Sequence, residues 1–558
     1  MRLCPKCRRE YMDDTLAFCL DDGSLLLDGP GSESATAIFG ENDLKPRLPV
    51  ERPGTTPRDT GRAPIPTWQR TVLLGLAAVL VGAAAFALYR YLAPPTAERI
   101  ESIAVLPFVN ETGNPDLEYL SDGMTETLIA SLGNLPNLSV KSRSSVFRYK
   151  GQDRDARAVG SELSVPAIVT GRVVQRGQDL TLYIELVDTA TENSLWKHTY
   201  NRNLSDLVAL QSDIARDVAR KLGARISGAD EARLTRGYSA DPEAYQLYMR
   251  GRFHTLRVTR PELLKAIPLY EKAIELDPNY ALAYVGLADA YRGLALAGEL
   301  DPQLYFPKAK AAAVKAVQLD DSLAEAHALL GWIIYWYEWD WEAAEQHSRR
   351  ALELDPESGD AHMALAHILS SLRRHDEAID LARRGRESDP LNVRTSALEA
   401  QFLTYAGRND EAIERLQAVL ELDRDYWFAN QFLTSALIEK GRFDEAIAAG
   451  EKGRAVYPEN TRNISFIAYA LARAGRPAEA RARLSEMLTQ RESRFVPPFS
   501  IATVYAGLGE EEEAIKWLQR GIVERDPRMV FIYCEPKLDP LHGTPEFEAL
   551  LRRMHFKS

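Results

Sequence analysis

The sequence predicts a mixed architecture: a small metal-binding segment, one transmembrane helix, an α/β sandwich domain and an all-α solenoid of helical repeats. Three of the four cysteines fall within the first twenty residues, nineteen residues from Thr71 carry no charge, and alanine recurs every 34 residues in the second half. A chain of 558 residues, 45% hydrophobic and 27% charged, is typical of several folded domains and excludes a mostly disordered protein.

The first segment, residues 1–28, contains Cys4, Cys7 and Cys19, followed by Asp22. Two thiolates separated by two residues can chelate one ion, and these residues resemble a bacterial zinc ribbon. The resemblance implies one Zn²⁺ bound by Cys4, Cys7, Cys19 and Asp22. Because Asp22 stands where that family usually has a cysteine, we expect a weaker hold than four thiolates give. The alternative is a metal-free segment with reactive thiols, and both interpretations favour a reducing compartment.

The second segment, residues 29–66, is rich in Gly, Pro, Ser and Thr and shows no apolar period. It predicts a flexible linker, because it cannot bury enough apolar surface to offset the entropy of ordering. Residues 71–92 then predict a transmembrane helix, since nineteen uncharged residues at about 1.5 Å each cover roughly the 30 Å hydrocarbon layer. A buried core helix is the alternative, but the linker and Pro94-Pro95 leave it nothing to pack against.

Basic residues predict the orientation of this helix. Arg52, Arg58, Arg62 and Arg70 precede it, and fewer basic residues follow it closely. The excess of positive charge places the amino terminus in the cytoplasm, in agreement with the clustered thiols. The predicted location is a bacterial inner membrane, crossed once, with the amino terminus cytoplasmic and the C-terminal domains extracytoplasmic.

Residues 100–225 alternate short apolar runs with amphipathic stretches, which predicts the α/β sandwich domain. We expect strands at 102–108, 138–141, 167–175, 180–188 and 194–200, and helices at 120–132, 155–163 and 207–222. The stretches IAVLPFVNETGNPDLEYLSDGMTETLIASL and VTGRVVQRGQDLTLYIELVDTATENSLW resemble the TolB-amino-terminal-like (FlgO-like) domain. That family is structural or assembly-related and implies no catalytic residues. The same module occurs beside winged-helix regulators and nucleotide cyclases, which suggests a signalling layout.

Residues 241–525 repeat every 34 residues. Alanine and glycine each keep this spacing, at Ala344, Ala378, Ala412, Ala446, Ala480 and Ala514, and at Gly407, Gly441, Gly475 and Gly509. These residues resemble the tetratricopeptide repeat (TPR), in which alanine lets two helices cross closely and glycine ends the first helix. We expect eight repeats, followed by a C-terminal helical cap over residues 526–558.

Stacked helix pairs expose a concave groove lined by the first helix of each pair, which is a surface for a protein or peptide partner. The repeat register places there a stripe of side chains that we expect to contact the partner: Trp332, Tyr335, Trp336, His367, Gln401, Tyr405, Phe428, Tyr469 and Arg473. Aromatic residues and arginine dominate binding energies. The alternative is that Trp332 and Trp336 pack within their own repeat, the interpretation we prefer for Trp339 and Trp341.

The sequence predicts no enzyme. It contains no G-x-x-x-x-G-K-[ST] phosphate loop, no G-x-S-x-G elbow and no H-E-x-x-H metal motif. Asp122 and Glu126, one turn apart, are interpreted as the start of a helix with Glu126 exposed, and Cys534 lacks an evident partner.

The predicted function is a membrane-anchored protein-interaction scaffold or signalling protein that binds a protein or peptide partner in the TPR groove. The alternative is a zinc-ribbon transcriptional or signalling regulator with the TPR region as its sensor. A net charge of −12 disfavours nucleic acid as a partner of the whole chain.

Overall fold

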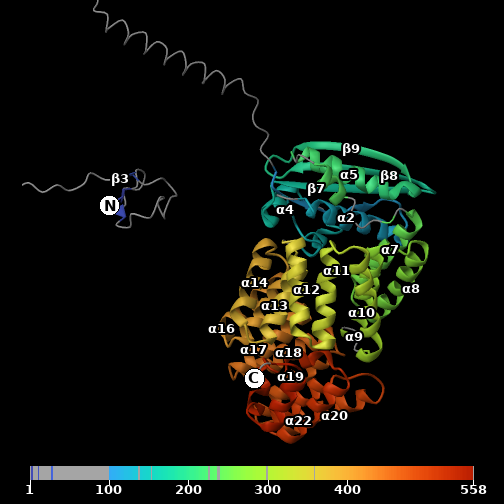
Figure 1. Ribbon diagram of the computed structural model, residues 1–558. Coiled ribbons are helices and arrows are strands. Elements are labelled where there is room, and N and C mark those ends of the chain that lie inside the picture. The colour runs from blue at the N-terminus through green and yellow to red at the C-terminus, as the bar shows by residue number, and fades with distance from the viewer. Residues whose placement is uncertain are drawn as a thin grey trace, which may run out of the picture. The chain divides into compact units, whose positions relative to one another are not determined.

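The computed structural model describes residues 100–558 apart from short gaps at 136–137, 153, 224–226, 235–238, 240, 297–299, 357 and 557–558 (Figure 1). Before residue 100 it describes only β1 (Arg2–Leu3), β2 (Glu10–Tyr11) and β3 (Leu27–Asp28), which form an antiparallel sheet in the order β2-β1-β3. They belong to a unit that is separate from residues 95–558. The predicted linker and the metal ligands Cys4, Cys7, Cys19 and Asp22 lie outside the described residues.

The structure corrects the predicted location in the inner membrane. Across the described residues, no helix combines the length and the low polarity that a bilayer crossing needs. One of the longest, α10 (Pro302–Leu319), has 18 residues but carries Lys308, Lys310 and Lys315. The predicted span, residues 71–92, itself lies outside the described residues. A single-pass protein with extracytoplasmic C-terminal domains is therefore not supported.

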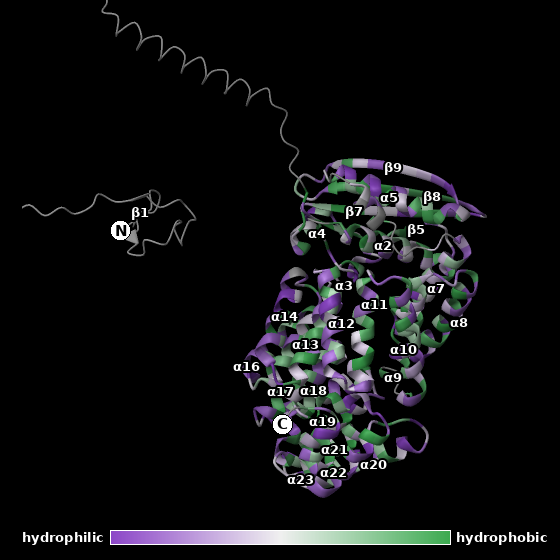
Figure 2. Ribbon diagram, viewed as in Figure 1, coloured by the Kyte–Doolittle hydropathy of each residue, from purple (hydrophilic) through white to green (hydrophobic). Residues whose placement is uncertain are grey.

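The α/β domain is built on a mixed sheet in the order β6-β4-β7-β8-β9, with β5 also pairing with β7. Its strands are β4 (Ser102–Val105), β5 (Val109–Asn110), β6 (Ser139–Val140), β7 (Ala167–Arg176), β8 (Asp179–Asp188) and β9 (Ser194–Asn203). Strand β4 runs parallel to β6 and β7, whereas β7, β8 and β9 form an antiparallel meander. The edge strand β9 exposes most of its residues and is largely hydrophilic (Figure 2).

Helices pack on the sheet and complete the domain. They are α2 (Glu118–Gly133), α3 (Arg143–Val146), α4 (Ala156–Leu163), α5 (Leu207–Lys221) and α6 (Gly228–Leu234), with the 3₁₀ turns η1 (Pro115–Leu117), η2 (Phe147–Tyr149) and η3 (Leu204–Asp206). Leu128 of α2 and Ile214 of α5 share one apolar core with the sheet, and Val159 of α4 lies in a second. The predicted α/β domain is confirmed as a mixed-sheet domain.

Among its described residues, the rest of the unit is a solenoid of sixteen helices in antiparallel pairs. In chain order they are α7 (Pro242–Thr255), α8 (Arg260–Leu276), α9 (Ala281–Leu296), α10, α11 (Ala324–Ile333), α12 (Trp341–Leu354), α13 (Gly359–Ser371), α14 (His375–Ser388), α15 (Val393–Tyr405), α16 (Asn409–Leu422), α17 (Trp427–Glu439), α18 (Phe443–Val456), α19 (Thr461–Arg473), α20 (Pro477–Arg491), α21 (Pro498–Leu508) and α22 (Glu511–Val523). The pairs are numbered repeats 1 to 8, from α7/α8 to α21/α22. A π-helical turn, η4 (Ile334–Glu338), extends α11.

The alanines and glycines that recur every 34 residues take the structural positions that the period predicts. The six alanines at 34-residue spacing are all fully buried where the two helices of a pair cross. The four glycines all have positive φ, from 71° to 76°, as the turn after a first helix requires. At the equivalent turns of repeats 3 and 4, Trp339 and Arg373 adopt the same left-handed conformation, with φ of 60° and 61°. The predicted solenoid is confirmed.

The solenoid closes on itself. Gln303, at the start of α10, donates from Nε2 to the carbonyl of Val523 in α22 at 2.8 Å. Arg525 donates from Nη1 to the carbonyl of Tyr337 at 3.3 Å. Repeats 2 and 3 therefore touch the end of repeat 8 and the residues that follow it.

The last residues form η5 (Pro527–Phe531), η6 (Pro536–Leu541) and α23 (Pro545–Arg553). They were predicted to cover the last repeat, and α23 does contact α22. They also reach back to repeat 3, because Trp341 donates from Nε1 to the carbonyl of Met554 at 2.7 Å and its ring lies 4.6 Å from that of Phe556.

The α/β domain rests on the solenoid at two places, α7 and the turn between α14 and α15. Tyr245 donates to Thr127 Oγ1 at 3.2 Å. The carboxylate of Asp389, a residue only 7% exposed, accepts hydrogen bonds from the hydroxyls of Ser142 and Ser145. Side chains far apart in the sequence thus join the two domains.

Glu126 belongs to this junction, and the interpretation of Asp122 and Glu126 as an exposed helix start is wrong. Helix α2 begins at Glu118, so both residues lie within it. Glu126 is 9% exposed and contacts Arg143 and, at 3.7 Å, Arg252 of α7. Burial raises the pKa of Glu126, and these arginines oppose the rise. Asp122 pairs with Lys150.

Candidate partner-binding groove

The nine residues of the predicted stripe lie on the first helices of repeats 3 to 7. Trp332 is on α11, Tyr335 and Trp336 are on η4, His367 is on α13, Gln401 and Tyr405 are on α15, Phe428 is on α17, and Tyr469 and Arg473 are on α19. The 34-residue register fixes this placement. The nine residues therefore lie on five consecutive first helices of the solenoid.

The stripe begins with an aromatic cluster. Trp332 and Trp336 stack with ring centroids 6.0 Å apart, and His367 meets Trp332 edge-on at 5.0 Å. Tyr335 is fully buried and its hydroxyl lies 2.8 Å from Ser371 Oγ. Burial lowers the pKa of His367 to about 3, so its imidazole is neutral at physiological pH.

The groove is occupied by the chain's own residues 526–541, which we call the C-terminal insert. Phe531 is 2% exposed, and its ring lies 5.6 Å from Trp336 and 5.9 Å from Tyr405. Met529, Val530 and Ile532 around it are completely buried. Two stripe residues, Trp336 and Tyr405, therefore contact the insert directly.

A charged network holds the middle of the insert. Tyr405 donates to Glu535 Oε2 at 3.3 Å and accepts from Gln401 Nε2 at 2.8 Å and from Arg462 Nη2 at 2.7 Å. The Arg462 guanidinium lies 4.6 Å from the Phe531 ring centroid. Glu535 is completely buried, so these donors replace the water that its carboxylate gives up.

Lys537 is the second buried charge of the insert. Its Nζ donates to Ser435 Oγ at 2.7 Å, to Glu439 Oε1 at 3.0 Å and to Glu535 Oε1 at 3.1 Å. Burial opposes its charge, but the carboxylates of Glu535 and Glu439 outweigh that effect and raise the pKa of Lys537. The ammonium is thus fixed between the insert and α17.

The beginning of the insert is anchored on repeats 7 and 8. Asp526 accepts from the backbone N–H of Phe499 at 2.8 Å and of Arg528 at 2.9 Å. Arg528 donates from Nη1 to Thr461 Oγ1 at 2.7 Å and to Ser500 Oγ at 2.9 Å. Burial raises the pKa of Asp526 to about 6.

Most of the stripe is closed to an outside partner while the insert is in place. Six of its residues are at most 9% exposed: Trp332, Tyr335, His367, Gln401, Tyr405 and Tyr469. Trp336 and Phe428 are partly exposed, and Arg473 is exposed. The alternative of packing within repeat 3 also holds in part, because Trp332 stacks on Trp336.

Trp339 and Trp341 are buried, at 2% and 7% exposure, but they do not pack only within their own repeat. Tyr335 lies 6.0 Å from Trp341. Arg525 lies 4.7 Å from Trp339, and the C-terminal residues cover Trp341. The two tryptophans therefore connect repeat 3 to the end of the chain.

Three groove residues were missed from the sequence, although the repeat register contains them. Ser435 lies 34 residues after Gln401, Glu439 lies 34 after Tyr405, and Arg462 lies 34 after Phe428. A rule that extended every stripe position through all repeats would have selected them. No periodic signal marks the insert, which lies beyond the repeats.

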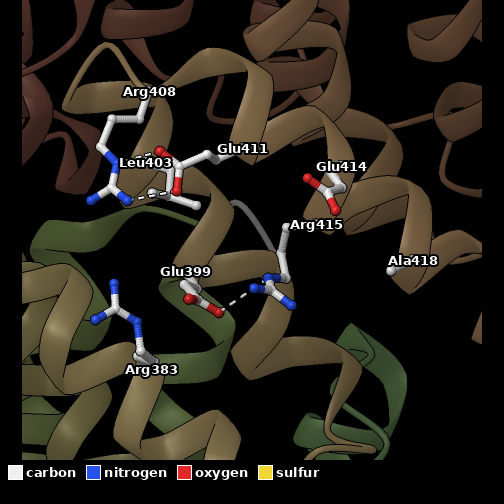
Figure 3. A pocket seen from close by; sticks show the side chains of 8 residues that line it. All are labelled: Arg383, Glu399, Leu403, Arg408, Glu411, Glu414, Arg415 and Ala418. Atoms are coloured by element: carbon white, nitrogen blue, oxygen red, sulfur yellow. Dashed lines mark hydrogen bonds and ion pairs between the residues drawn. The ribbon is translucent and has the colours of Figure 1, made fainter.

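A separate cavity of about 180 Å³ lies between α14, α15 and α16 (Figure 3). Its charges are paired: Glu399 contacts Arg386 at 2.6 Å and Arg415 at 3.3 Å, and Arg408 pairs with Glu411 at 2.6 Å. Because these charges neutralise one another, the cavity is a weaker candidate for a ligand than the groove.

Metal-ligating and nucleophilic groups do not gather elsewhere in the described part of the chain. Within it, no group of three or more His, Cys, Asp and Glu residues could hold a metal ion. Cys534 is 3% exposed, and burial raises the pKa of its thiol.

Parts of the chain match two families of known proteins. Residues 98–216 match the second domain of HilA/YgeH-like transcriptional regulators. Residues 269–301, 337–402 and 403–465 match tetratricopeptide repeats.

Two curated relatives share parts of their length with this chain. Putative adenylate cyclase 3 of Rhizobium meliloti is 33% identical over 195 residues, which are 35% of this chain and 33% of the relative. Transcriptional regulator HilA of Salmonella typhimurium is 26% identical over 237 residues, 42% of this chain and 41% of the relative. The chain thus spans between a third and two fifths of the length of these relatives.

Solved structures show similar helical repeats. YrrB, described as a TPR protein with an unusual peptide-binding site, is 23% identical with a TM-score of 0.25, covering 35% of this chain and 95% of YrrB. Yeast Tom70 is 14% identical with a TM-score of 0.36, covering 63% of this chain and 83% of Tom70. The family matches establish that this chain contains tetratricopeptide repeats, preceded by a domain similar to the second domain of HilA-like regulators.

Proposed function

We propose that this chain is a protein-interaction scaffold of a regulatory system, and that its TPR solenoid binds a protein or peptide partner. One observation carries the proposal: the inner side of the solenoid already holds an irregular peptide segment through aromatic and charged side chains. Phe531, Glu535 and Lys537 of that segment each contact residues from two or more repeats. A surface that binds one peptide this way has the chemistry to bind another.

The regulatory part of the proposal is supported by the domain that precedes the repeats. It is similar to a domain of transcriptional regulators, and it is joined to the solenoid through buried contacts at Asp389 and Glu126. A partner seated on the solenoid is therefore linked to the α/β domain through packed side chains. The proposal assigns no catalysis to the chain, and cyclase activity in the purified protein would contradict that part of it.

The test is site-specific photo-crosslinking in the cells that make the protein. A crosslinking residue replaces Arg473, the exposed groove residue of α19, and in a matched control it replaces Arg481, an exposed residue of α20. We expect a discrete partner protein to crosslink from position 473 and not from position 481. Identical products from both positions, or none from either, would refute binding in the groove.

A second candidate function is a zinc-ribbon transcriptional or signalling regulator whose solenoid is the sensor. The observation that favours it is the match of residues 98–216 to a domain of transcriptional regulators. In this proposal Zn²⁺ is held by Cys4, Cys7, Cys19 and Asp22, whose thiolates and carboxylate are ligands that zinc accepts.

This second candidate predicts that the full chain binds DNA with an affinity that falls steeply with salt and is lost on chelation of zinc. A Cys7→Ser variant measured beside the wild type shows whether the loss depends on the ribbon. DNA binding that survives chelation of zinc would refute this second candidate, and so would a lack of DNA binding at low salt. Either result would leave the scaffold as the remaining proposal.

A further inference from the structure

The C-terminal insert contacts the groove as a peptide ligand contacts a receptor. Phe531 lies against Trp336 of repeat 3 and Tyr405 of repeat 5. Lys537 bonds to Ser435 and Glu439 of repeat 6, and its Nζ lies 4.6 Å from the ring centroid of Phe466 in repeat 7. This single short segment therefore contacts side chains from at least four repeats.

Two turns of the solenoid that carry a non-glycine residue also contact the residues after α22. Of the six equivalent turns from repeat 3 to repeat 8, four have glycine and two have Trp339 and Arg373 in the left-handed conformation. That conformation costs a non-glycine residue about 1–2 kcal/mol. Arg373 donates to the carbonyl of Tyr533 at 2.8 Å and lies 4.6 Å from its ring centroid, and Trp339 lies under Arg525. Both turns therefore place a large side chain against the end of the chain.

Two buried charges fix which residue of the insert lies at which position of the groove. Replacing a buried ion pair with apolar residues is often neutral or stabilising, so such pairs contribute specificity more readily than stability. Glu535 and Lys537 are completely buried, and each bonds to groups that the groove supplies: Tyr405 for the first, Ser435 and Glu439 for the second. A shift of the insert by one residue would leave these charges unpaired. The groove thus discriminates by the positions of one carboxylate and one ammonium.

We propose that the C-terminal insert is the built-in ligand of the TPR groove, and that the groove exchanges it for a partner peptide of the same pattern. In that pattern an aromatic residue precedes a glutamate by four positions and a lysine by six, as Phe531 precedes Glu535 and Lys537. The inference rests on the proposed scaffold function and specifies its partner. The insert keeps the groove closed until such a partner is present.

Exchange sets a condition on the partner. A tethered segment acts at an effective concentration on the order of mM, so a peptide with the same contacts and no others is outcompeted at µM concentrations. The partner therefore has to reach groove residues that the insert leaves accessible. Arg473 is exposed and Phe428 is partly exposed, and both stand at groove positions of their repeats.

The experiment measures binding of a fluorescent peptide, residues 526–541 with Cys534→Ser, to the full chain by anisotropy. In the Lys537→Met protein the insert loses its bonds to Ser435 and Glu439 while the groove stays intact. We expect this variant to bind the peptide at least about 10-fold more tightly than the wild type, because each charged hydrogen bond contributes on the order of 10-fold or more. The Lys516→Met protein is the matched control, since Lys516 pairs with Glu513 on the surface of α22, away from the insert.

A second peptide tests the pattern itself. This peptide itself carries Lys537→Met. Its affinity for the Lys537→Met protein is expected to be at least about 10-fold lower than that of the first peptide. Equal binding of the two peptides would overturn the inference. So would no binding, at peptide concentrations up to about 1 mM, which the tethered insert itself reaches, to a Lys537→Met protein whose circular dichroism matches the wild type. If that variant does not fold, Glu535→Gln replaces it, because it removes the negative charge that pairs with Arg462 of the groove.

Failure of this inference and failure of the proposed function are distinguishable. The peptide experiment needs no cellular partner, so peptide exchange without a partner crosslinked from position 473 would refute the scaffold function alone. A partner that crosslinks from position 473 while the Lys537→Met protein rejects the peptide would refute the built-in ligand alone.

Discussion

Asp526 is the residue at which the chain leaves α22 and enters the groove. Its carboxylate is completely buried and accepts two backbone N–H groups, yet burial outweighs these bonds and its pKa is raised to about 6. Between about pH 4 and pH 6 the native state therefore holds a proton at Asp526 that the open insert releases. This buried carboxyl makes the anchoring of the insert depend on pH.

We predict that the insert is held less firmly as pH rises. Because the native pKa of Asp526 lies above its unfolded value, the proton stabilises the closed insert at low pH, and this stability is lost as pH rises from about 4 to 6. Between pH 4.5 and pH 7.5 the loss amounts to roughly 2 kcal/mol in the free energy of opening. The measurement is amide hydrogen exchange of residues 529–532 in the wild type and in Asp526→Asn.

The Asn variant cannot titrate, so its opening free energy is expected to show no loss from this position. Intrinsic exchange rates are the same for both proteins at each pH, and they cancel in the comparison. Parallel pH profiles for the two proteins would show that Asp526 does not control the insert.

Residue identity at a turn could be predicted only where the repeat was regular. The period of 34 residues located Gly407, Gly441, Gly475 and Gly509 correctly, because a left-handed turn favours glycine and leaves it visible in the sequence. The same period assigns Arg373 to this turn but does not reveal its strained conformation. Nor does it reveal the hydrogen bond from Arg373 to the carbonyl of Tyr533, 160 residues later, which no local pattern encodes.

At the scale of elements, close helix crossings decide which glycines are replaceable. In α9, a Cβ on Gly286 would lie 2.4 Å from ring atoms of the buried Tyr270. In α14, a Cβ on Gly385 would meet Met363 and Thr395 at 3.5 Å, an ordinary contact. Gly286 is therefore required by a close helix crossing, whereas Gly385 has room for a larger side chain.

We predict that Gly385→Ala stabilises the solenoid by about 0.5–1 kcal/mol, because alanine loses less backbone entropy in a helix. Gly286→Ala is expected to destabilise it by about 1–3 kcal/mol, because Tyr270 has to move. Urea unfolding followed by circular dichroism measures both. The same sign for both substitutions would contradict the crossing geometry.

The elements themselves were largely predictable, and their partners were not. Strands 167–175 and 180–188 were expected within a few residues of β7 and β8, because alternating apolar residues mark a strand that is buried on one face. The docking of Ser142 and Ser145 on Asp389 was not predictable, since it joins residues about 245 positions apart through polar side chains that follow no period.

At the largest scale, the described residues from 100 onward form a closed TPR superhelix. It carries the α/β domain at α7 and at the turn between α14 and α15, and holds its own C-terminal segment inside. Two residues of the stripe chosen from the sequence, Trp336 and Tyr405, contact a segment of the same chain in this structure. The prediction of a terminal cap assumed that the last residues follow the axis of the solenoid. They turn inward instead, because the closed superhelix offers Phe531 and Lys537 buried partners that the outer face does not.

The most direct measurement is amide hydrogen exchange of the full chain, comparing residues 529–538 of the insert with the groove helices α15 and α17. If the insert is an exchangeable ligand, it opens without the solenoid, and its amides exchange at least about 100-fold faster than those of the two helices. If it is a permanent part of the core, insert and helices exchange together at the rate of global unfolding, and the account is contradicted.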